Sequence, residues 1–150
     1  MYRWKRELRQ LVTFFGWTAP EQPVPCITMD GLTDWLRSFK LDVHLHLHVT
    51  EVFRALPETV RAPFMSDAAF ILTDYEPVRG QAYLIPFASP SLNKPARSVV
   101  LKRTLRQRSP EFVRYIIAHE LAHAHLNNGG RFPGDDPELA ADALASDWGF

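Results

Sequence analysis

Two histidines and a glutamate form the pattern with the most chemical content in this chain, the segment His119-Glu120-Leu121-Ala122-His123. In a helix, residues four apart share one face, with Cβ atoms about 5–6 Å apart. Two imidazoles at that separation can both reach one ion at the roughly 2.0–2.1 Å of a zinc–nitrogen bond. Glu120 is rotated by about 100° from His119, so it points beside the ion, where a general base for a metal-bound water stands. The pattern predicts a catalytic site with one zinc ion.

The surrounding residues carry the start and stop signals of a helix. Ser109 is a suitable N-cap, Pro110 fits the first helical position, and the run 127–130, Asn-Asn-Gly-Gly, supplies a stop. Between these signals helical spacing connects Phe112, Ile116, His119, Ala122, His123 and Leu126. We therefore expect one helix of about four or five turns.

A catalytic zinc site needs a third protein ligand and keeps one position open. The acidic candidates downstream of the second histidine are Asp135, Asp136, Glu138, Asp142 and Asp147. Asp136 and Pro137 suit the cap and first position of a second helix that runs to about Asp147. On that helix Glu138 and Asp142 share a face. We predict Glu138 as the third ligand and Asp142 as the acceptor of the free N–H of a ligating imidazole.

A HExxH helix followed by a Glu-x-x-x-Asp helix resembles the gluzincin clan of zinc metallopeptidases, and the chain looks most like the minimal gluzincins and the ImmA/IrrE-like peptidases. The matching motifs span Ser109 to Phe150. The resemblance implies a zinc metalloendopeptidase with His119, His123 and Glu138 as zinc ligands, Glu120 as base and Asp142 as the partner of a ligand. Larger gluzincins carry a further domain after the glutamate helix that supplies oxyanion-stabilising residues, whereas this chain ends at Phe150.

Other interpretations of the same residues stay open. The segment could be a surface helix, or its zinc could be structural, although a structural site gains nothing from a carboxylate such as Glu120. A regulatory zinc-binding module on a gluzincin-like scaffold would lack turnover. SprT-like peptidases, which act on DNA-associated proteins, also use a HExxH helix but take a third histidine downstream. The last histidine here, His125, lies about 200° around the helix from His123.

The amino-acid composition is typical of an ordinary soluble globular domain. With 150 residues, 46% hydrophobic and 23% charged, the chain suits a single domain over 1–150. A chain with zero net charge has no overall electrostatic attraction for nucleic acid or acidic membranes, so the expected partner is a peptide or protein substrate. A lone cysteine, Cys26, favours a reducing compartment, and no apolar run is long enough for a signal peptide or a membrane span. We expect a cytoplasmic protein.

The order of the remaining elements predicts an α+β domain with a zincin-like arrangement. The active helix should pack across a small mixed or antiparallel sheet that follows N-terminal helices. Upstream, the expected elements are a helix over 4–15, a helix over 32–39, a strand over 41–50, a short helical turn in 51–62 interrupted by Pro57, a hairpin of 68–75 with 81–87, and a strand over 97–103.

The predicted strand over 41–50 rests on a strict alternation of apolar residues with His44, His46 and His48. A solvated face explains these histidines best, with a loose second metal site or an oxyanion donor as alternatives. The oxyanion donor is otherwise unassigned, with Tyr75, Tyr83 and Tyr115 as further candidates.

By resemblance the strand over 97–103 borders the substrate cleft, which places its outward residues Ser98, Val100 and Lys102 near an extended peptide. Most of the basic residues of the chain's one basic cluster lie on or after this strand, and the full set is Lys94, Arg97, Lys102, Arg103, Arg106, Arg108 and Arg114. A solvated surface explains such a run most simply, and the functional alternative is a bias towards acidic peptides.

Overall fold

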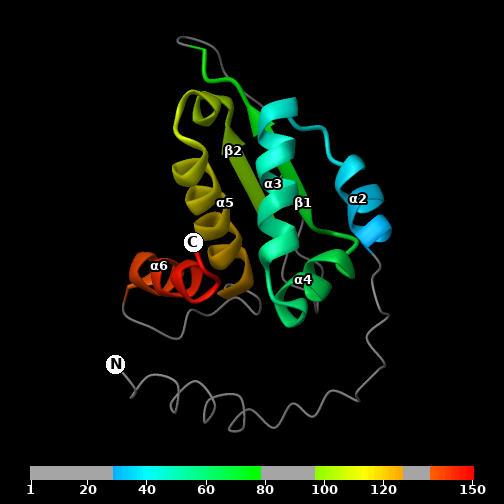
Figure 1. Cartoon of the computed structure of the whole chain (residues 1–150), viewed down its shortest axis with the longest axis vertical. Helices are drawn as coiled ribbons and strands as arrows, with labels where there is room; N and C mark the ends of the chain where they lie inside the picture. Colours follow the sequence, from blue (N-terminus) through cyan, green and yellow to red (C-terminus); the bar gives the residue numbers. More distant parts are fainter. Residues whose placement is uncertain (1–28, 79–96, 127–135) are drawn as a thin grey trace, which may run out of the picture.

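A computed structural model describes residues 29–78, 97–126 and 136–150, in which five α-helices, one 3₁₀ helix and two strands form an α+β fold dominated by helices (Figure 1). The elements in order are α2 (Met29–Arg37), α3 (Val43–Ala55), α4 (Glu58–Met65), β1 (Ile71–Tyr75), β2 (Ser98–Lys102), the 3₁₀ helix η1 (Arg103–Gln107), α5 (Pro110–Leu126) and α6 (Pro137–Asp147). The predicted N-terminal helix, Cys26, the second hairpin strand, Tyr83 and Lys94 lie outside the described residues.

The two strands pair in parallel, with Ile71 opposite Ser98 and Tyr75 opposite Lys102. The antiparallel alternative is therefore wrong for this pair, and a mixed sheet would need a strand outside the described residues. A parallel pair requires a crossover of about a dozen residues or more, which the interval 76–97 is long enough to supply. Within β2 the predicted inward residues Val99 and Leu101 are buried.

The predicted strand over 41–50 is wrong, because these residues begin helix α3. Its buried residues Leu45, Val49, Val52 and Phe53 recur with helical periodicity that extends past the alternating segment. The other two alternating apolar residues, Val43 and Leu47, are 74% and 56% exposed, so the alternation did not mark a buried face. Asp42 caps the helix by accepting a hydrogen bond from the backbone N–H of His44 at 3.0 Å.

The ambiguous segment over 51–62 resolves into two helices separated at Pro57. Helix α3 ends at Ala55, and Pro57 is the N-cap of α4. Its fixed φ and missing N–H suit the start of a helix better than its interior. The predicted interruption is confirmed, and the helical content on both sides exceeds the turn or two expected.

The core lies between α3, α5 and the strands. In Figure 1, α3 and α5 run side by side with β1 and β2 behind them, and α6 crosses near the C-terminal end of α5. Helix α5 turns its buried residues Val113, Ile117 and Leu121 towards this core. A cluster of aromatic rings in edge and stacked contacts closes the core beside α2 and consists of Trp35, Phe39, Phe53, Phe64 and Phe70.

Asp74, whose side chain is 1% exposed, ties η1 to the rest of the fold. Its carboxylate accepts hydrogen bonds from Arg103 Nε at 2.7 Å and from the backbone N–H of Asp42. Arg106 adds ion pairs to Asp42 at 3.4 Å and to Glu76 at 3.5 Å. These contacts hold η1 against the start of α3 and the end of β1.

Arg97 belongs to the predicted basic cluster but is buried. Its Nε donates to Asp67 Oδ2 at 2.9 Å, and its Nη2 donates to the Pro63 carbonyl oxygen at 2.8 Å. The guanidinium carbon lies 4.9 Å from the centre of the Phe64 ring. Side chains of Arg97 and Asp67 are only 7% and 13% exposed, so this pair joins α4 to the start of β2 in a water-poor setting.

We expect Asp67→Ala to lower the free energy of unfolding by about 3 kcal/mol, because it strands a buried guanidinium. The matched control is Asp34→Ala, whose pair with Arg37 is 70–73% exposed and should be worth less than about 0.5 kcal/mol. Urea unfolding followed by circular dichroism measures both. Equal losses in the two variants would contradict the structural role assigned to the Arg97 pair.

Candidate metal centre

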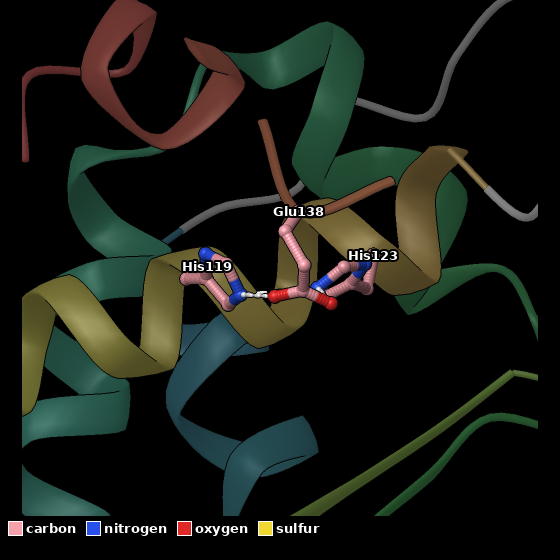
Figure 2. Close-up of side chains that lie close together, drawn as sticks. All are labelled: His119, His123 and Glu138. Carbon is pink, nitrogen blue, oxygen red and sulfur yellow. Dashed lines mark hydrogen bonds and ion pairs between the residues drawn. The ribbon is translucent and has the colours of Figure 1, made fainter. Parts of the chain in front are cut away.

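Helices α5 and α6 bring His119, His123 and Glu138 together (Figure 2). The Glu138 carboxylate lies between the two imidazoles, with Oε2 3.3 Å from His119 Nε2 and Oε1 3.3 Å from His123 Nε2. The two Nε2 atoms are 3.0 Å apart. One potential ligand atom from each residue lies within 4.8 Å of the others, so the group could hold a metal ion.

These separations agree with a tetrahedral ion. Ligands about 2.0–2.1 Å from a tetrahedral zinc lie about 3.3 Å from one another, from simple geometry. The two imidazole nitrogens are 3.0 Å apart, and each lies 3.3 Å from a different oxygen of the Glu138 carboxylate, so all three separations are near that value. Side-chain exposure rises from 13% for His119 to 70% for Glu138, so the group opens to solvent on the Glu138 side.

Hydrogen bonding fixes the tautomer of His119. Its Nδ1 lies 2.7 Å from Asp142 Oδ1, and an ionised carboxylate only accepts, so Nδ1 carries the proton. The Nε2 atom of a neutral ring then has a lone pair directed at Glu138 and His123. Lone pairs that converge in this way repel unless a cation lies between them or a ring is protonated. Neutral imidazoles are also the form that binds metals.

Tyr115 supports the same carboxylate from one helical turn earlier on α5. Its hydroxyl donates to Asp142 Oδ1 at 2.5 Å. This bond, assisted by His119 and opposed by partial burial, lowers the pKa of Asp142 below its usual range. The same bond raises the pKa of Tyr115. Asp142 therefore stays ionised and holds the His119 ring, as its position four residues after Glu138 predicts.

Local sequence signals position the two helices. Ser109 Oγ accepts from the backbone N–H of Phe112 at 3.4 Å at the start of α5. Asp136 accepts from the backbone N–H of Glu138 at 3.0 Å and caps α6 before Pro137. The two helices pack against each other and both bury alanines, whose short side chains permit a close approach: Ala118 and Ala122 on α5, and Ala141 and Ala145 on α6. Both predicted helix starts are confirmed.

Comparisons of this chain with family models, curated proteins and solved structures found no match. Any functional conclusion therefore rests on the chemistry and geometry of the side chains.

Glu120 lines a cleft with a volume of about 560 Å³ between α5 and the segment formed by β2 and η1. Its lining residues are Val100, Leu101, Lys102, Thr104, Leu105, Gln107, Arg108, Phe112, Ile116 and Glu120. On α5, Phe112, Ile116 and Glu120 follow one another at intervals of four and form one wall. Glu120, the neighbour of His119 on α5, therefore lies in the wall of this cleft.

Two of the three predicted edge-strand residues lie on this cleft. Val100 and Lys102 line it, whereas Ser98 is not among its described lining residues. Contact of these residues with substrate stays a prediction. Sequence periodicity grouped Phe112 and Ile116 with the histidines but did not indicate that they face a cleft, and Arg108 was placed only within a general basic cluster.

The histidines of α3 do not join the centre. Among the described residues, the only candidate metal group contains none of them. His48 Nδ1 lies 3.3 Å from Glu51, which in turn accepts from Arg114 on α5 at 3.1 Å. The hydrogen bond from Arg114, together with His48, lowers the pKa of Glu51 despite its partial burial. These contacts link α3 to α5.

The oxyanion donor stays unassigned. The Tyr115 hydroxyl already donates to Asp142, and Tyr83 lies outside the described residues. His125 points away from the centre, as predicted, with its ring 6.4 Å from that of Phe64 and 6.0 Å from that of Trp148. Burial lowers the pKa of His125 and favours its neutral form.

Proposed function

We propose that this protein is a zinc-dependent metallopeptidase of gluzincin-like design, with His119, His123 and Glu138 as ligands and Glu120 as general base. The convergence of two imidazole nitrogens and one carboxylate at near-tetrahedral spacing carries the proposal. The adjoining cleft, with Glu120 in its wall, supports a catalytic rather than a structural role. Two histidine nitrogens and one glutamate oxygen, with the fourth position open, are one of the ligand sets found in catalytic zinc sites.

A bound zinc ion would lower the pKa of a coordinated water towards ~7 and polarise a substrate carbonyl. Glu120 accepts the proton that the attacking water loses as its oxygen bonds to the carbonyl carbon. When the carbon–nitrogen bond breaks, Glu120 returns that proton to the leaving amine. Asp142 holds the His119 ring throughout, and Tyr115 holds Asp142.

Cleavage of unfolded protein tests this function directly. The purified full-length chain is incubated with denatured casein and with a mixed peptide library, with zinc and then with a chelator, and products are identified by mass spectrometry. Cuts that require zinc and disappear in Glu120→Gln support the proposal. No cleavage with zinc, or cuts by this protein that survive both the chelator and the substitution, would contradict it.

A zinc-binding module without turnover is the second candidate. It is favoured by one observation: the hydroxyl of Tyr115, one of the candidate oxyanion donors, is engaged with Asp142. This candidate predicts tight zinc binding without cleavage of any library member. A SprT-like site is not favoured, because His125 packs between Phe64 and Trp148 instead of facing the ligands.

Loss of the hydrogen bond between Asp142 and His119 should weaken metal binding. We expect Asp142→Ala to lower zinc affinity by about 10–100-fold, the usual cost of removing a partner of a ligating histidine. Tyr115→Phe should cost less, because Asp142 keeps its bond to His119. Competition with a fluorescent zinc chelator measures both, and Asp147→Ala, which removes an exposed carboxylate from the same helix, is the control. Unchanged affinity in Asp142→Ala would show that the His119 contact has no role in metal binding.

A further inference from the structure

Two basic side chains line the cleft without a carboxylate partner. Lys102 ends β2, Arg108 follows η1, and both are exposed. Among the described residues neither forms an ion pair. The other described arginines of the same cluster are each committed to a carboxylate: Arg97 to Asp67, Arg103 to Asp74, Arg106 to Asp42 and Glu76, and Arg114 to Glu51. Of the described members of the predicted basic cluster, two are therefore without an ion pair, and both line the cleft.

The remaining walls combine this charge with apolar surface. Leu105, Phe112 and Ile116 line the cleft, and Phe112 is 45% exposed although large and apolar. The only acidic residue in the lining is Glu120. Since the whole chain has zero net charge, the excess of basic over acidic residues in this lining is local. Low-dielectric walls around such charges strengthen their attraction for an anionic ligand.

We propose that Lys102 and Arg108 are specificity-determining residues that select polypeptide segments in which an acidic residue neighbours an apolar one. This inference rests on the proposed peptidase function and names its substrate class. The apolar side chain of the bound segment packs on Phe112 and Ile116. The carboxylate of its acidic residue accepts charge-assisted hydrogen bonds from Lys102 and Arg108. A nucleic-acid strand fits less well, because it would bring phosphates towards Glu120 and the lining residues offer only Phe112 as an aromatic ring for base stacking.

Binding of designed peptides to the full-length chain tests the proposal without turnover. The probes are fluorescein-labelled decapeptides with a central Leu-Phe pair, flanked by glutamates in one, glutamines in the second and lysines in the third. Fluorescence anisotropy is measured on chelator-treated and on zinc-loaded protein at low salt. We expect the glutamate peptide to bind at least ten-fold more tightly than the lysine peptide in both forms. This difference should shrink in 0.5 M NaCl.

Charge-reversal variants show whether the peptide preference comes from the cleft or from basic residues elsewhere on the surface. Lys102→Glu with Arg108→Glu should reverse the order of the three peptides. Lys40→Glu with Arg54→Glu makes the same change in net charge at exposed positions outside the cleft lining and should leave the order unchanged. Circular dichroism and zinc affinity confirm that each variant is folded.

The outcomes distinguish this inference from the proposed function. Zinc-dependent cleavage with equal binding of the three peptides would overturn the charge preference and leave the peptidase intact. Charge-selective binding without zinc affinity or cleavage would leave the cleft assignment standing and refute the peptidase. A reversed order in the control pair, or tighter binding of a ten-nucleotide poly-dT strand than of the glutamate peptide, would also overturn the proposal.

Discussion

Replacing Glu120 with glutamine should lower the rate of peptide hydrolysis by roughly 10²–10⁴-fold, the range attributed to a positioned general acid–base group. Glutamine keeps the size and the hydrogen-bonding reach of glutamate but cannot take the proton from the attacking water. Glu120 is not one of the three converging ligands, so zinc affinity should change little. The expected signature is a folded, zinc-loaded protein that binds peptide and does not cut it.

The matched control is Glu111→Gln, the same substitution on the exposed side of α5. Glu111 is 77% exposed and pairs only loosely with Arg114, at 3.6 Å. Its replacement should leave the rate within about two-fold of the original, because exposed pairs contribute little. Full activity in Glu120→Gln, with zinc-dependent cleavage preserved, would remove Glu120 from the mechanism. Loss of zinc in that variant would instead show that Glu120 is itself a ligand.

Glu138→Ala should lower zinc affinity by more than about 100-fold and abolish cleavage at ordinary zinc concentrations. Removal of an outer partner of a ligand already costs about 10–100-fold, and a ligand should cost more. Because the Glu138 side chain is 70% exposed, its loss removes no core packing. A drop in metal affinity therefore cannot be attributed to unfolding, which makes this variant more informative than a histidine substitution.

Asp147→Ala is the control for Glu138→Ala, since both remove an exposed carboxylate from α6. It should keep the zinc affinity of the original protein. Thermal unfolding gives a second measure, because an ion that binds only the native state raises the midpoint in proportion to the logarithm of its concentration over Kd. Zinc should raise the midpoint of the original chain and of Asp147→Ala but not that of Glu138→Ala. Equal zinc stabilisation in all three would contradict Glu138 as a ligand.

The residues of the candidate centre could be predicted from the sequence because the geometry within each of its two helices is set locally. Caps at Ser109 and Asp136 define where the two helices begin, and spacing within each helix fixes which side chains share a face. The convergence of Glu138 on the two histidines was a prediction about tertiary packing that these helices bear out. The Tyr115 bond to Asp142 was missed, although its position four residues before His119 places it on the same face.

The fold around the centre was less predictable because it depends on distant contacts. The alternating segment before Glu51 has both strand and helical periodicity. It forms a helix because that conformation buries Leu45, Val49 and Phe53 together in the core. Parallel pairing of β1 with β2 depends on the path of the chain between them, which local propensity does not specify. Arg97 and Arg103 likewise form ion pairs with carboxylates about 30 residues away in the sequence, which local sequence patterns do not indicate.

No helix among the described ranges combines the length and apolar character needed to cross a bilayer.

Zinc content of the purified full-length protein tests the central claim most directly. After dialysis against metal-free buffer, elemental analysis of the original chain and of Glu138→Ala is compared with protein concentration. The proposed centre predicts close to one zinc ion per original chain and almost none in Glu138→Ala. Iron in place of zinc, no retained metal after zinc loading, or equal zinc in both proteins would contradict the proposed zinc centre of His119, His123 and Glu138.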